Sequence, residues 1–296
     1  MGTSKSYGGP TDTSQLLPSW ALNPEATASP PADGDAPAAN GEPATSTPDS
    51  GADDDSTPPA PGVQPGSGPA RPWASAKTRL GKVVLAGGTR ESFQSAGRAY
   101  VRARGGSSGA ARAARAGRRA TAALAGFLSG VATNGLRPTL ERLGLTSYVG
   151  RDAQQVFAAI SNALAPAGAS LEEAVARRAT NEVLLGFYER LGVQENGLAR
   201  LEAMSADDIK KAVEDSISAY VYHRWLEELG EMIEQRVVSP LEAERIEGQM
   251  RGYVNEVVHL DLKYVDVVAL DWKGPAGTKL IEDLYAQAYG VLGGPV

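Results

Sequence analysis

Two histidines are the first side chains in this sequence that could do metal or acid–base chemistry. His259 follows Glu256 at the Glu-x-x-His spacing of di-iron helix bundles, but those bundles need two copies of the motif and this chain has one. His223 is followed by Glu227 at a spacing that places both on one face of a helix. We therefore predict ordinary surface or interface histidines and no metal site.

Cysteine and phosphate-binding motifs offer no further candidate for catalysis. The sequence has no cysteine, which excludes disulfides, thiolate zinc sites, iron–sulfur clusters and a cysteine nucleophile. The stretch KVVLAGGT (residues 82–89) resembles the glycine turn before a nucleotide-binding helix, but the rest of the GxGxxG pattern is missing. A short helix and a turn are predicted there instead. We expect no catalytic residue and no cofactor.

The first twenty residues carry more specific chemistry than a free chain end usually does. Removal of Met1 before a small residue leaves Gly2 with a free and unhindered amine. The start MGTSKS also fits a myristoylation pattern, which we set aside because so short a motif often occurs by chance. Two leucines and a tryptophan beside a long polar stretch are typical of a short linear docking motif. The residues predicted to contact a partner are Thr3, Ser4, Gly8, Gly9, Pro10, Leu16, Leu17, Pro18 and Trp20.

An acidic, Pro-rich linker occupies residues 23–70. It contains no aromatic residue, and Val63 is its only large apolar side chain. Such a composition cannot bury enough apolar surface to offset the roughly 1–2 kcal/mol per residue of conformational entropy that ordering costs. We therefore predict a disordered segment between an N-terminal linear motif (residues 1–22) and the folded part of the chain.

The net charge of −6 conceals three blocks of opposite sign. Residues 1–70 carry a net charge of −8, residues 71–119 carry +11 and residues 120–296 carry −9. Clustered bases can contact phosphates, the acidic linker of the same chain or an acidic protein partner, although a basic helix face can also be simply solvated. We predict a helical segment at residues 71–119 with a basic interaction surface that consists of Arg98, Arg102, Arg112, Arg115 and Arg119.

Helix-capping signals recur along the rest of the chain. Thr89 and Ser205 are suitable N-caps, and capping boxes begin at Ser170 and Ser239. After Ser239, apolar residues recur three and four apart as far as Val267, which favours one long helix over a strand at residues 260–264. The sequence therefore predicts an all-α core domain at residues 120–296 with long antiparallel helices. The predicted helices cover about residues 90–104, 110–132, 152–164, 171–191, 206–235, 240–267 and 278–292.

Several stretches of the chain resemble the QatB family of Qat anti-phage defence systems. The matching stretches begin with MGTSKSYGGP, LLPSW and the acidic Pro-rich spacer. They continue with ARPWASAKTRL, the Arg- and Gly-rich stretch through GGSSGAARAARAGRR, and GFLSGVATNG. The resemblance runs along the whole chain, and the N-terminal motif is its most specific part.

The resemblance implies partners. Qat systems combine a QatB protein with an ATPase (QatA), a QueC-like enzyme (QatC) and a TatD-like nuclease (QatD), and the resemblance implies the same partners here. QueC enzymes adenylate a 7-deazaguanine carboxylate, which an amine then attacks to form an amide. A protein amine could replace ammonia in that step, and the Gly2 amine suits this role.

The resemblance and the amine chemistry together predict the function. We expect a non-enzymatic substrate and scaffold protein of an anti-phage complex, modified at Gly2 by the QueC-like partner. The alternative is a nucleic-acid-binding adaptor that acts through residues 71–119, and an all-α metal enzyme is a third, disfavoured possibility. No run of apolar residues is long enough to span a membrane and no signal peptide is visible, so we expect a cytoplasmic protein.

Overall fold

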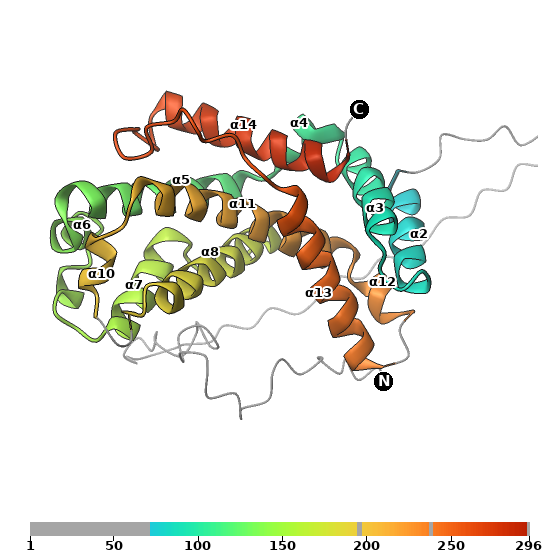
Figure 1. Cartoon of the computed structure of the whole chain (residues 1–296), viewed down its shortest axis with the longest axis horizontal. Coiled ribbons are helices and arrows are strands. Elements are labelled where there is room, and N and C mark those ends of the chain that lie inside the picture. Colours follow the sequence, from blue (N-terminus) through green and yellow to red (C-terminus); the bar gives the residue numbers. More distant parts are fainter. Residues whose placement is uncertain (1–71, 194–196, 237–238, 295–296) are drawn as a thin grey trace, which may run out of the picture. The chain divides into compact units, whose positions relative to one another are not determined.

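The computed structural model describes residues 72–193, 197–236 and 239–294 (Figure 1). All regular structure in these ranges is helical, which confirms the predicted all-α class. The predictions for the N-terminal motif and the acidic linker lie outside the described residues. The helices are α2 (Pro72–Leu85), α3 (Arg90–Ala103), α4 (Gly106–Ala113), α5 (Arg115–Asn134), α6 (Leu136–Arg142), the 3-10 turn η1 (Thr146–Tyr148), α7 (Ala153–Leu164), α8 (Leu171–Arg190), α10 (Ala199–Glu202), α11 (Ala206–Leu229), α12 (Glu231–Glu234), α13 (Pro240–Val257) and α14 (Pro275–Leu292).

Four helices begin at side-chain caps that the sequence predicts. α3 follows Thr89 and α13 follows Ser239, and both hydroxyls accept a backbone N–H bond from the first turn. α8 begins with a complete capping box between Ser170 and Glu173, and α11 begins in the same way at Ser205. Residues 82–89 form the end of α2 and a turn, as predicted. Capping is a local interaction, so the sequence alone locates these helix starts.

The predicted helix at residues 110–132 is two helices. α4 already begins at Gly106, and the chain breaks at Ala114 (φ −84°, ψ 49°) before α5 starts. The GGSSG stretch therefore forms the first turns of α4 instead of a connection, because the left-handed conformation of Gly105 (φ 85°) and Gly106 (φ 80°) makes the turn. α5 ends before Gly135, as predicted.

The long helix predicted at residues 240–267 is wrong beyond Val257, where α13 ends. Three aspartates lie in the segment that follows, and each accepts a backbone N–H bond from the residue two positions later: Asp261 from Lys263, Asp266 from Val268 and Asp271 from Lys273. Such local bonds compete with helical ones and favour turns. No strand forms at residues 260–264 either.

Three long helices form the middle of the body. α8 and α11 run antiparallel, because Arg190 pairs with Asp215 at one end (3.8 Å) and Arg178 pairs with Glu227 at the other (2.7 Å). α5 packs against α8 and α11, and α14 packs on the other side of α5, as Figure 1 shows. The long predicted helix at residues 206–235 ends at Leu229, and the short α12 follows Gly230.

An aromatic cluster fixes α3 and α13 to the end of α11. Phe93 stacks on Tyr253 with ring centroids 5.8 Å apart, and Tyr100 stacks on Trp225 at 5.9 Å. All four rings are buried. Stacked aromatic pairs add about 0.5–1.5 kcal/mol beyond the burial of their area, so this end of the body is firmly packed.

Candidate docking groove and charged clusters

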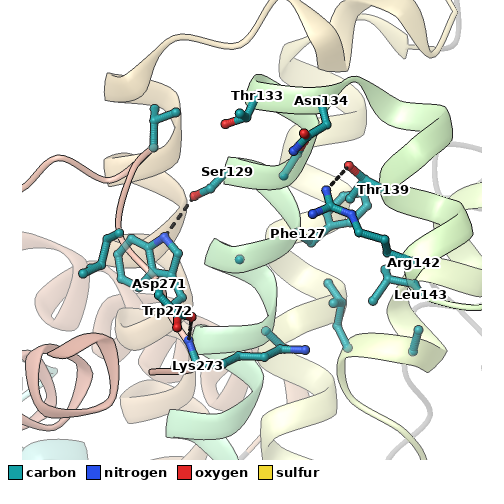
Figure 2. Close-up of a pocket in the computed structure, with 17 residues that line it drawn as sticks. Phe127, Ser129, Thr133, Asn134, Thr139, Arg142, Leu143, Asp271, Trp272 and Lys273 are labelled. Carbon is teal, nitrogen blue, oxygen red and sulfur yellow. Dashed lines mark hydrogen bonds between the residues drawn. The ribbon is translucent and has the colours of Figure 1, made fainter. Parts of the chain in front are cut away.

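α5 presents a face of small side chains to the surface, and three hollows meet on it. Ala123 lines all three of them. A hollow of about 440 Å³ covers the C-terminal half of α5 (Figure 2), one of about 700 Å³ covers its N-terminal half, and one of about 250 Å³ lies toward the α7–α8 connection. We call the three together the α5 groove.

One tryptophan holds the wall of the α5 groove in place. The indole N–H of Trp272 lies 2.9 Å from Ser129 Oγ on α5 and 3.0 Å from the carbonyl oxygen of Val267, as Figure 2 shows in part. Ser129 Oγ in turn donates to the Val267 carbonyl (2.7 Å). These bonds fasten the irregular segment after α13 against α5, and Trp272 is only 2% exposed.

Four cationic side chains line the hollow over the N-terminal half of α5, which we call the basic hollow. They are Arg115, Arg118, Arg119 and Lys273, and no acidic side chain lines it. Arg118 pairs with Glu282 on α14, and Arg119 lies 3.9 Å from a Glu173 oxygen. Arg115 and Lys273 have no ion pair among the described residues. The basic hollow therefore carries uncompensated positive charge.

The structure brings together two of the five arginines predicted to form the basic surface. All five are exposed, but only Arg115 and Arg119 line the basic hollow. Arg98 donates to the carbonyl of Gly293 (3.0 Å), and Arg112 lies on α4 and donates to the carbonyl of Ser108 (3.3 Å). Arg102 is exposed elsewhere on α3. The expectation that Arg112, Arg115 and Arg119 share one helix is wrong, because the chain breaks at Ala114.

One arginine of the basic segment belongs to the interior. Arg104 donates to Glu228 Oε1 at 2.8 Å, and Arg224 reaches the same oxygen at 2.7 Å. The three side chains are only 10–13% exposed. Burial raises the pKa of the neighbouring Tyr100 and Tyr289 hydroxyls, so they stay neutral beside the carboxylate. Sequence reasoning missed this cluster because Glu228 lies 124 residues from Arg104.

His223 lies in a charged cluster between α8, α11 and α13. Its Nε2 is 2.8 Å from Glu182 Oε2, and Arg251 donates to the other carboxylate oxygen at 2.7 Å. Glu227, the neighbour expected from the sequence, pairs with Arg178 instead. Burial alone would raise the pKa of Glu182, but the hydrogen bonds and positive charges of His223 and Arg251 lower it below the ordinary value.

Glu182 is expected to make stability depend on pH in the acid range. A carboxyl whose pKa is lowered by folding stabilises the native state above its unfolded pKa of about 4.3, and this contribution is lost as pH falls through the lower folded pKa. Between pH 6 and pH 3 the urea midpoint of the wild type should therefore fall further than that of Glu182→Gln. Glu189→Gln, an exposed position on the same helix, is the control. Parallel curves for wild type and Glu182→Gln would contradict this account of the cluster.

The second histidine does not form a helical Glu-x-x-His motif. α13 ends at Val257, Glu256 pairs with Arg90, and the His259 carbonyl accepts a bond from Gln287. Within the described ranges, no group of three or more His, Asp or Glu side chains is arranged to hold a metal ion. None of the described helices is long and apolar enough to cross a membrane.

The fold and the α5 groove define the class: an all-α protein with a surface groove along one of its central helices, part of which is the basic hollow. The family model described as "Qat anti-phage system associated protein QatB" matches residues 105–292, from the turn before α4 to the end of α14. This chain belongs to the QatB family. Its role therefore lies in Qat anti-phage defence, with other Qat components as its partners. No curated protein and no solved structure matches the chain.

Proposed function

We propose that this QatB-family chain is a non-enzymatic scaffold of a cytoplasmic Qat defence complex, and that its QueC-like partner attaches a 7-deazaguanine to Gly2. The observation that carries the proposal is the N-terminal sequence itself, in which Gly2, Thr3 and Ser4 are all small. Residues 3–71 separate Gly2 from the start of α2, so the reacting amine and the helical body are far apart in sequence. The predicted contacts at Thr3, Ser4, Gly8, Gly9, Pro10, Leu16, Leu17, Pro18 and Trp20 belong to this proposal.

The choice of Gly2 over the lysines follows from amine chemistry. In the proposed step, the neutral amine attacks the carbonyl carbon of the acyl-adenylate, an amide bond forms, AMP leaves and the amine loses a proton. An α-amino group has a pKa of about 7.7–8.0, against about 10.4 for lysine. At neutral pH it is uncharged roughly several hundred times more often than a lysine. Glycine also adds the least steric hindrance.

The apolar patch at residues 16–20 has a role separate from the reacting amine. Leu16, Leu17 and Trp20 offer a short apolar surface to the partner. Binding there raises the effective concentration of the nearby Gly2 amine at the partner's active site. The helical body then keeps the modified tail within the defence complex, through surfaces of its own.

Trp20→Ala is expected to reduce modification of Gly2 without unfolding the body. Removing the largest apolar side chain of the patch weakens docking by about 2 kcal/mol or more if it is a hot spot, which corresponds to a roughly thirtyfold loss. The fraction of modified chain after co-expression with the QueC-like component measures the effect. Val63→Ala, in the acidic linker, is the control, and circular dichroism checks the helices. Unchanged modification of Trp20→Ala would contradict a docking role for the patch.

A nucleic-acid-binding adaptor is the second candidate. The observation in its favour is that Arg98, Arg102, Arg112 and Arg115 are exposed and form no ion pair with an acidic side chain among the described residues. Contacts with phosphates release counterions, so the logarithm of affinity would fall with the logarithm of salt by about 0.7–0.9 per contact. A measured slope near zero would exclude this candidate.

A further inference from the structure

We propose that the α5 groove binds an acidic peptide segment of a partner protein. The carboxylates of this segment would pair with the cations of the basic hollow, and its small or aliphatic side chains would lie on the apolar floor. This site is distinct from the N-terminal motif, and the proposal holds whether or not Gly2 is modified.

The charge of the basic hollow selects an anionic occupant. Two of its four cations already have an acidic partner. Arg118 forms an ion pair with Glu282, and Arg119 lies 3.9 Å from Glu173. Arg115 and Lys273 are exposed and have no acidic partner in the part of the chain that the structure describes. Carboxylates of a bound peptide could therefore pair with Arg115 and Lys273 without breaking an ion pair inside the protein.

The shape of the α5 groove favours an extended ligand. Three hollows converge on Ala123, and together they follow α5 from Arg115 to Asn134. A helix of this length measures about 30 Å, at 1.5 Å per residue. An extended peptide advances about 3.3 Å per residue, so about nine residues would lie along the groove. The basic hollow alone, at about 700 Å³, is within the size range of small-ligand and peptide pockets.

The floor of the basic hollow favours a peptide over a nucleic acid. It is made by Ala122, Ala123, Ile281 and Trp272, and the Trp272 side chain is buried. Single-stranded nucleic acids bind on exposed aromatic rings, and no exposed ring lines this hollow. A specific duplex interface buries about 1,000 Å² or more of protein surface, which is more than a hollow lined by nine residues provides. Membership of the QatB family also implies that the partners are proteins, namely the other Qat components, which agrees with a peptide ligand.

Site-specific photo-crosslinking in cells that carry the whole Qat system tests the proposal. Benzoylphenylalanine at Thr278, an exposed residue on the rim of the basic hollow, should crosslink to an acidic segment of another Qat component, which mass spectrometry then identifies. The same probe at Glu244, an exposed position on α13, is the control. Crosslinking to nucleic acid, to this chain itself or to nothing overturns the proposal.

Charge reversal in the same cells provides the second arm. Arg115→Glu combined with Lys273→Glu should reduce the Thr278 crosslink by about tenfold or more, because like charges then face the carboxylates of the peptide. Arg137→Glu combined with Arg151→Glu changes the net charge equally at exposed positions outside the basic hollow and should have little effect. Circular dichroism and the thermal midpoint confirm that both variants fold. Equal losses in the two variants would show that only the overall charge matters, and would overturn the proposal.

Discussion

A chain that carries several unrelated residues before Gly2 is expected to lose modification completely, and anti-phage protection with it. The proposed amide forms on the terminal amine, and an extension converts that amine into a peptide nitrogen that is no longer nucleophilic. The new terminal amine lies at a different distance from the Leu16–Trp20 patch and lacks the small residues that follow Gly2. Plaque counts and N-terminal peptide mass, measured in the same cells, report the two losses.

The control for this experiment is the same extension with a protease site that leaves Gly2 as the first residue after cleavage. Cleavage in the cell should restore both modification and protection, which shows that the extended chain folds and assembles. Full protection by the uncleaved chain would contradict the proposed role of Gly2. Loss of protection that cleavage does not restore would contradict it as well.

Glu228→Gln is expected to lower the free energy of unfolding by about 3–5 kcal/mol. The Glu228 carboxylate is the shared partner of Arg104 and Arg224, and all three side chains are largely buried. Removing its charge leaves two guanidinium groups inside the body without the anion that compensates them. Breaking a buried ion pair in this way costs far more than removing an exposed one.

Glu227→Gln is the matched control, because Glu227 is the preceding residue on α11 and pairs with the exposed Arg178. Its loss should cost about 0–1 kcal/mol. Urea unfolding followed by circular dichroism at 222 nm measures both variants against the wild type. Similar losses for Glu227→Gln and Glu228→Gln would show that the Arg104–Glu228–Arg224 cluster is not a buried ion pair in solution.

Local signals explain what the sequence could predict about the fold. Thr89, Ser170, Ser205 and Ser239 each bond to backbone groups within their own first turn, so the helix starts need no knowledge of the rest of the chain. The predicted end of α13 was wrong for a reason that is also local. The three-and-four spacing of apolar residues up to Val267 indicated a helix, but the aspartate turns that follow Val257 prevailed.

The charged clusters were beyond sequence reasoning, because their partners lie far apart along the chain. Arg104 and Arg118 look like members of a basic surface until α11 and α14 supply Glu228 and Glu282. Lys273 has no signal that connects it to Arg115, yet both line the basic hollow. Charge clustering in the sequence therefore singled out Arg115 and Arg119 but not Lys273, and the role of the predicted basic surface in binding stays a prediction.

The mass of the N-terminal peptide tests the central claim most directly. The full-length chain is purified from cells that carry the whole Qat system and show active defence, and from matched cells that lack the QueC-like component. The account predicts a 7-deazaguanine joined through an amide to the Gly2 amine in the first sample and an unmodified Gly2 in the second. An unmodified Gly2 in cells with active defence would contradict it.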